Sequence, residues 1–442
     1  MKIDPRRYRT ILTLAIPIMA AMVSQNILNL VDTAMVGFLG PISLAAVGVG
    51  GFAAFMANAT VLGLASGVQV MASRRKGEGR DDETAVPLNG GLFLALLIGV
   101  PTSIVIFIFV PTIFPLLNSD PSIIAEGVPY LASRVVAVTA MGMNFCFRGF
   151  WTAVDRPGLY LRMLLFIHVC NVVISYVLIF GHLGFPALGT LGAGIGTTVA
   201  VILGTAVHLI VAWRMARPHG FLHRVPGAET MRTMVRLGVP STVQQFLFAA
   251  GITALFWIIG QLGADSVAAA TVLVNLVLVA LLPAMGLGMA GTTLVGQALG
   301  RGNPDDAKRW GWEVVLLSFI LVGGLGTIAI AIPDILLAGF LHDPAVLAIG
   351  LEPLRLSGFT IAFDAAGLIL SYTLLGAGAA ARVMHVSVLS QWAVGLPMAW
   401  IVGPYLGFGL LAVWGAFIAY RLLQTAVYAG LWAGGRWATI KV

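Results

Sequence analysis

Three polar side chains share one face of an otherwise apolar segment near the start of the chain. Gln25, Asn29 and Asp32 are four and three residues apart, which places them on one side of a helix. Lipid cannot satisfy polar side chains, so this stripe must face protein or water. A carboxylate with amide and hydroxyl oxygens suits a small hard cation such as Na⁺. The same carboxylate, partly desolvated, could carry a proton instead. The alternative is a hydrogen-bonded seam between two helices.

Further polar side chains fall within apolar segments of both halves of the chain. The first half adds neutral oxygens at Asn144, Asn171, Ser175, Thr197 and Thr198, of which Asn171 and Ser175 are one helical turn apart. In the second half, Gln244, Asn275 and Tyr372 could play a similar part around Asp364. Each set could supply contacts for a cation or for a bound substrate.

Four charged residues fall within the apolar segments, namely Asp32, Asp364, Arg134 and Arg421. A charge at the bilayer centre costs about 2.5–3.5 kcal/mol on insertion scales, so such residues usually face a cavity or a partner. A structural ion pair or a side chain that reaches the membrane surface is the alternative for each. We favour cation binding for the two aspartates and structural roles for the two arginines.

The elements that must position these residues are transmembrane helices. Of the 442 residues, 59% are hydrophobic and only 10% are charged, whereas a soluble domain carries about 25% charge. The composition predicts an all-α polytopic membrane protein with little chain left for a domain outside the membrane. Apolar runs long enough to span the bilayer are expected at residues 10–34, 44–72, 88–113, 124–147, 161–181, 191–213, 234–259, 267–297, 311–332, 346–373, 384–403 and 408–433.

Charged residues in the links between the spans indicate the orientation. Lys and Arg gather before the first span, after every second span and at the end of the chain, while the other links carry mainly Asp and Glu. This distribution predicts that both termini are cytoplasmic. It also explains the net charge of +7 without nucleic-acid binding. Cys146 and Cys170 fall within spans, so they favour neither a disulfide framework nor a metal cluster.

The two halves of the sequence match each other at a shift of 223 residues. RTILTLAIP at residues 9–17 pairs with RTMVRLGVP at 232–240, and GFLGPISLAA at 37–46 pairs with GQLGADSVAA at 260–269. Six spans separate the copies, so the copies share one orientation and are related by an axis along the membrane normal. We expect a six-helix lobe at 1–217, a cytoplasmic linker at 218–230 and a second lobe at 231–442, with a substrate cleft between the lobes. The matched Pro17 and Pro240 can kink their helices and act as hinges.

The motifs SQNILNLVDTAMVGFLG (residues 24–40) and IAFDAAGLILSYTLLGAG (361–378), together with the repeat, resemble the multidrug and toxic compound extrusion (MATE) family over essentially the whole chain. The similarity is to prokaryotic members of the NorM and DinF types. It implies twelve helices in two pseudo-symmetric lobes and the efflux of organic cations in exchange for Na⁺ or H⁺.

The resemblance also implies roles for individual residues. Asp32 and Asp364 match carboxylates of the family, Asn171 and Thr197 match neutral ligands of its amino-lobe cation site, and Gln25 and Asn144 match substrate contacts. A Na⁺ ion is therefore expected at Asp32, Asn171 and Thr197, and Pro17 matches a proline that bends. Ser175 stands where DinF-type members carry a second aspartate, and Phe248 stands near a glutamate of NorM-type members. Both H⁺ and Na⁺ stay open as the coupling ion.

These observations predict a cation-coupled multidrug antiporter that has no resident cofactor. We expect a monomer in the prokaryotic inner membrane that exports organic cation drugs and dyes and contacts lipid but not nucleic acid. The coupling ion would bind at Asp32, Asn171, Ser175, Thr197 and Asp364, and the substrate at Gln25, Asn29, Asn144, Gln244, Asn275 and Tyr372.

Two other functions are weaker alternatives. A lipid-linked glycan flippase of the same superfamily usually needs several buried arginines for pyrophosphate, and only Arg134 and Arg421 are candidates. A membrane enzyme is less favoured, because the seven histidines form no HExxH or other metal-binding spacing.

Overall fold

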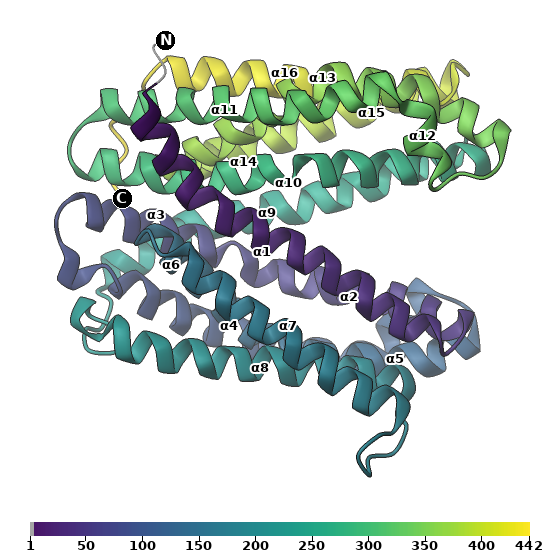
Figure 1. Ribbon diagram of the computed structural model, residues 1–442, viewed down its shortest axis with the longest axis horizontal. Helices are drawn as coiled ribbons and strands as arrows, with labels where there is room; N and C mark the ends of the chain where they lie inside the picture. Colours follow the sequence, from purple (N-terminus) through teal and green to yellow (C-terminus); the bar gives the residue numbers. More distant parts are fainter. Residues whose placement is uncertain (1–3) are drawn as a thin grey trace. The chain divides into compact units, whose positions relative to one another are not determined.

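The computed structural model describes residues 4–442, and every regular element in that range is helical (Figure 1). Among these residues, 11 helical segments are long and apolar enough to cross a membrane. The pair α5 (Pro121–Val135) and α6 (Val138–Ala153), bent by 48°, makes a twelfth when it is counted as one span. The expected all-α class with twelve spans is confirmed.

The chain divides into two compact units. The amino-terminal unit is Ala20–Thr242, and the carboxy-terminal unit combines Val243–Val442 with residues 4–19. The second boundary lies 223 residues after the first, which is the shift of the sequence repeat. The boundaries fall inside two long helices, α1 (Pro5–Gly37) and α9 (Ala228–Gly260). Each boundary follows within three residues of Pro17 or Pro240, where the helix lacks a backbone hydrogen bond.

Proline and short polar side chains set where many of the helices begin. Gly40, with φ of 116°, and Pro41 separate the first two helices, as the sequence indicates. Asp120 caps α5 by accepting a hydrogen bond from the Ser122 N–H at 2.8 Å, and Asp343 caps α13 in the same way. The amino-terminal unit also contains α2 (Pro41–Leu62), α3 (Leu64–Gly77), α4 (Val86–Leu117), α7 (Pro157–Phe180) and α8 (Gly189–Met215), with short 3₁₀ turns at Asp81–Glu83 and Arg217–His219.

The carboxy-terminal unit contains one helical span that is interrupted by wider turns. α14 (Ala380–Val388) and α15 (Leu396–Trp400) are joined and followed by π-helical turns at Leu389–Gly395 and Ile401–Tyr405. These pieces together form one span, Ala380–Tyr405. The other helices of this unit are α10 (Ala264–Gly300), α11 (Pro304–Ala331), the short α12 (Pro333–Ala338), α13 (Pro344–Gly376) and α16 (Gly409–Ala433).

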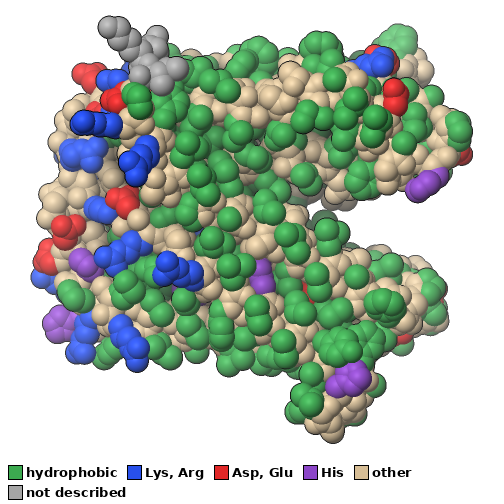
Figure 2. All heavy atoms as spheres, viewed as in Figure 1, with side chains coloured by type: hydrophobic (Ala, Val, Ile, Leu, Met, Phe, Trp, Pro, Cys, Tyr) green, Lys and Arg blue, Asp and Glu red, His purple; other side chains and the backbone are tan. Residues whose placement is uncertain are grey.

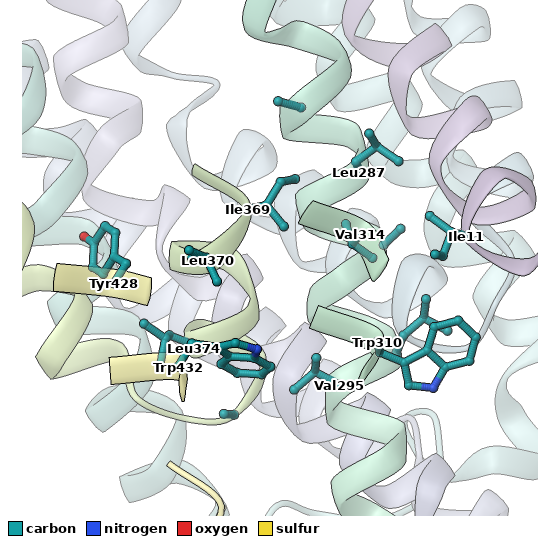
Figure 3. Packing of buried hydrophobic residues seen from close by; sticks show 14 of the residues in the cluster. Ile11, Leu287, Val295, Trp310, Val314, Ile369, Leu370, Leu374, Tyr428 and Trp432 are labelled. Atoms are coloured by element: carbon teal, nitrogen blue, oxygen red, sulfur yellow. The ribbon is translucent and has the colours of Figure 1, made fainter. Parts of the chain in front are cut away.

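Apolar packing explains why the start of α1 belongs to the carboxy-terminal unit. Ile11, Leu14 and Ala15 are buried in a core cluster with residues of α10, α11, α13 and α16. Figure 3 shows Ile11 with Leu287 and Val314 of this cluster. The first turn of α1 is also held by charge, because the Arg7 guanidinium bonds Asp306 at 2.6 Å and Glu313 at 2.5 Å.

The start of α9 packs in the corresponding way on the amino-terminal unit. A Cβ on Gly63 would lie 2.3 Å from the Gly238 carbonyl oxygen and 2.2 Å from Thr242 Oγ1, so only glycine permits this approach. The expected linker, 218–230, also folds against this unit. The Asn89 amide donates to the carbonyls of Gly220 at 2.8 Å and Arg224 at 2.9 Å, and Arg224 pairs with Asp82 and Glu83.

The surface chemistry agrees with membrane-spanning units. On the visible face, hydrophobic side chains cover the flanks of the helices of each unit, while charged side chains gather at helix ends (Figure 2). Glu313 is an exception that the sequence analysis does not name. It lies near the start of α11 and is only 1% exposed, and both Arg7 and Arg309 pair with it.

Candidate functional site

Asp32 is the centre of a polar site in the amino-terminal unit. It lies on α1 and is partly buried, and the Asn171 side-chain amide of α7 donates to its Oδ2 at 3.3 Å. Ser175, one turn further along α7, donates to Asn171 Oδ1 at 2.7 Å and so fixes the direction of the amide. Asp32 Oδ1 is buried and has no hydrogen-bond partner among the described residues. The carboxylate therefore keeps one acceptor oxygen free for a proton or a cation.

No salt bridge to Asp32 is found within residues 4–442, although Arg134 lies within electrostatic range of its carboxylate. The nearest aromatic contact of the Arg134 guanidinium is the Tyr130 ring, 6.0 Å away. A carboxylate inside a membrane-spanning helix is usually paired. Asp32 instead combines a neutral donor, a positive charge at longer range and an open oxygen.

The polar stripe of α1 continues away from Asp32 as a hydrogen-bonded chain. Gln25 Nε2 donates to Asn29 Oδ1 at 3.2 Å, and Gln25 Oε1 lies 3.3 Å from His168 Nε2 on α7. Gln25 and Asn29 are exposed, whereas His168 is buried. The predicted face of α1 is thus real, and its amides are free to contact a solute on their exposed side.

Close packing of α7 and α8 holds the Asp32 partners in place. A Cβ on Gly196 of α8 would lie 2.3 Å from Ser175 Oγ. The missing side chain lets α8 approach α7 directly behind the hydroxyl that orients Asn171. Small residues at such contacts are the usual means by which membrane helices approach each other closely.

Two other residues expected at this site bond elsewhere. The Thr197 hydroxyl donates to the Ala193 carbonyl of its own helix at 3.0 Å. The Asn144 amide of α6 donates to Val201 O at 3.3 Å and lies 3.0 Å from Thr205 Oγ1, both on α8, and its buried Oδ1 has no partner among the described residues. Asn171 and Ser175 are thus brought to Asp32, while Thr197 and Asn144 use their donors in helix contacts.

Asp364, in the carboxy-terminal unit, has a different environment. Its Oδ1 forms a salt bridge with Arg421 Nη2 of α16, and the two side chains are 14% and 16% exposed. Arg421 Nη1 also donates to Gln424 Oε1 at 3.2 Å. The pair borders a cavity of about 20 Å³ that is also lined by Thr360 and Trp414.

The expected neighbours of Asp364 lie in other contacts. The Gln244 amide donates to Ser387 Oγ at 3.0 Å, and the Asn275 amide donates to the Thr271 carbonyl at 2.8 Å. Tyr372 is two helical turns from Asp364, about 12 Å along the axis, and its ring packs at Gly288.

Sequence reasoning missed two partners at these sites. The contact of His168 with Gln25 was not predicted, although His168, Asn171 and Ser175 are three and four residues apart and so share a face of α7. Arg421 and Asp364 were singled out separately as charges at membrane depth, and their unlike signs were the available signal for a pair.

Comparison with known proteins agrees with this architecture. The MatE family model matches residues 17–177 and again residues 240–401. The "Probable multidrug resistance protein NorM" of Mesorhizobium japonicum is 28% identical over 420 residues, which are 92% of this chain and 89% of that protein. The protein of the same name from Bradyrhizobium diazoefficiens is 30% identical over 432 residues, 95% of this chain and 91% of that protein.

A solved structure shares the fold. It is described as the outward-facing conformation of a multidrug resistance MATE family transporter of the MOP superfamily. Its TM-score is 0.88 at 19% sequence identity, with 97% of each chain covered. The two matches to the family model start 223 residues apart, as the sequence repeat does. The chain belongs to the MatE family, the multidrug and toxic compound extrusion transporters.

Proposed function

We propose that this chain is a cation-coupled antiporter that exports organic cation drugs and dyes by alternating access, with H⁺ or Na⁺ as the coupling ion. The observation that carries the proposal is Asp32, a carboxylate inside a membrane-spanning helix with a buried oxygen that has no partner among the described residues. Asn171 and Ser175 support it with oriented neutral groups. A proton or a Na⁺ ion would neutralise the carboxylate when it binds.

The proposed cycle requires that drug and ion favour different states of the protein. If both bound the two states equally well, neither could drive the other. An ion that enters from outside and binds Asp32 would favour release of the drug outward. The exposed amides of Gln25 and Asn29 lie on the same helix as Asp32, so the drug and ion sites are adjacent.

The membrane potential limits what one ion can do. A charge that moves inward across 100 mV supplies ~2.3 kcal/mol, which supports roughly a fiftyfold gradient of a neutral drug. Exchange of one monovalent cation for one monovalent drug would be electroneutral, and only the chemical gradient of the ion would then drive it.

Pro17 and Pro240 are the proposed hinges of this motion. Each lies within three residues of a boundary between the compact units, at matched positions of the repeat. A helix bends most readily where proline removes a backbone hydrogen bond.

The remaining parts of the proposal follow from the family and from the charge distribution. The protein would be a monomer of the prokaryotic inner membrane with both termini in the cytoplasm, in contact with lipid and not nucleic acid. It would have no resident cofactor and no enzymatic activity. The flippase alternative is weakened because Arg421, one of its two candidate pyrophosphate ligands, is bound by Asp364.

The test is efflux of a cationic dye from proteoliposomes with an imposed H⁺ gradient or Na⁺ gradient, each applied separately. One gradient should drive efflux by the natural chain, which identifies the ion. Asp32→Asn should slow this efflux roughly tenfold or more, since couplings between sites are typically 5–150-fold. Full gradient-driven efflux by Asp32→Asn would exclude the mechanism.

A further inference from the structure

The two carboxylates at membrane depth are neutralised in opposite ways. Asp32 has a neutral donor and an open oxygen, whereas Asp364 is bound by a guanidinium of its own chain. We propose that Arg421 is a built-in counter-cation that closes Asp364 to the coupling ion, so that ion exchange uses Asp32 alone. This inference rests on the proposed function, because it concerns which carboxylate carries the exchanged ion.

The guanidinium cannot leave the site as a bound ion can. An arginine side chain stays charged at any physiological pH and matches the geometry of a carboxylate. The pair borders a cavity of about 20 Å³, and a water needs about 10–15 Å³ measured in this way. The space beside the carboxylate therefore fits a single water.

Helix contacts fix Arg421 opposite Asp364. One turn further along both helices, Thr425 Oγ1 lies 3.2 Å from the Phe363 carbonyl of α13. A Cβ on Gly367 would lie 2.1 Å from Thr425 Oγ1, so α13 and α16 approach closely there. The Gln424 side chain accepts a second hydrogen bond from the guanidinium at 3.2 Å.

The neutral groups of this cavity are committed to other partners. Ser357 Oγ donates to the Pro353 carbonyl at 2.9 Å and accepts from Trp414 Nε1 at 2.7 Å. The Thr360 hydroxyl donates to the Leu356 carbonyl at 2.9 Å. The other residues of the lining are apolar, so Asp364 and Arg421 are its only charged groups. Nothing here corresponds to the oriented amide that serves Asp32.

A gain of function tests the proposal directly. Arg421→Gln leaves a buried carboxylate without its cation, and that carboxylate should then take up Na⁺ or a proton. In purified full-length protein on an Asp32→Asn background, radioactive ²²Na⁺ binding and the infrared band of protonated carboxyl groups report the two cases. Asp32→Asn alone should show no cation uptake at Asp364, Arg421→Gln should add one site, and Asp364→Asn added to Arg421→Gln should remove it again.

Transport provides the second arm. Asp364→Asn alone would leave an unpaired buried arginine and could fail to fold, so the double variant Asp364→Asn with Arg421→Gln is used. It should retain dye efflux driven by the same ion with unchanged ion-to-dye stoichiometry. A folded double variant that loses gradient-driven efflux, or an Arg421→Gln protein without a new cation site, would overturn the inference. The proposed function fails by a separate result, unchanged efflux in Asp32→Asn.

Discussion

At the scale of single residues, the chain uses the same carboxyl group for two purposes. A charge in the bilayer interior is tolerated when it has a partner or reaches water. Asp364 has a permanent partner in Arg421, and removal of one member of a buried pair leaves an uncompensated charge. Asp32 has the Asn171 amide and one open oxygen, so its charge can be compensated reversibly.

Gln25 offers a test of substrate binding that leaves the ion site intact. Gln25→Ala removes an exposed amide that bridges His168 and Asn29. We expect the KM for dye efflux to rise about fivefold, which corresponds to one hydrogen bond of about 1 kcal/mol, with the ion dependence unchanged. Asn26→Ala is the matched control, because the Asn26 amide donates to the Met22 carbonyl of its own helix at 3.0 Å. Equal KM values for the two variants would contradict a role of Gln25 in binding.

The sequence predicted Asp32 as the centre of the site because helical spacing alone puts Gln25, Asn29 and Asp32 on one face. It could not predict which neutral groups reach Asp32. Thr197 and Ser175 are both plausible oxygens in apolar segments, and only the packing of α8 on α7 decides that Ser175 orients Asn171. The pairing of Asp364 with Arg421 depends on contacts between segments far apart in sequence, which periodicity does not encode.

At the scale of helices, the boundaries of the elements follow local chemistry. The expected break at Gly40 and Pro41 is confirmed because glycine takes a positive φ there and proline begins the next helix. Pieces within spans were harder to predict. The bend between α5 and α6 and the π-helical turns of Ala380–Tyr405 contain no residue pattern that the hydrophobic period would reveal.

Gly196 tests how strongly the α7–α8 contact supports the ion site. Gly196→Ala places a Cβ 2.3 Å from Ser175 Oγ, so one helix must move. Overpacking of this kind costs about 1–3 kcal/mol, and we expect a lower unfolding temperature in detergent together with weaker binding of the coupling ion. Gly48→Ala in α2 is the control, because nothing lies within 4 Å of the added Cβ. If both variants behave like the natural protein, the helix contact does not position Ser175.

At the scale of the whole molecule, the repeat and the compact units share one period but not the same starting point. The sequence repeat predicts division near the linker at 218–230. Contacts place residues 4–19 with the second half of the chain and the start of α9 with the first half. Long-range packing of Ile11 and Leu14 determines this exchange, and neither composition nor spacing indicates it.

Arg7 tests the attachment of the first turns of α1. Arg7→Ala breaks ion pairs to Asp306 and to Glu313, which is only 1% exposed. Arg309 still pairs with Glu313 at 2.9 Å, so we expect a loss below the 3–5 kcal/mol typical of a fully broken buried pair, about 2 kcal/mol. The measurement is the apparent Tm in detergent, with Arg6→Ala at an exposed neighbouring position as the control. A Tm equal to that of Arg6→Ala would show that the apolar contacts alone hold this segment.

The exchange of first helices has a consequence for biosynthesis. The start of α9 emerges from the ribosome when the helices that receive it are already made. Ile11 must instead wait for Leu281 and the residues that follow it in the core. At synthesis rates of about 5–20 residues per second, this delay is on the order of 15–50 s. The first segment to enter the membrane is therefore among the last to find its native neighbours, and a chain interrupted before α10 leaves it without them.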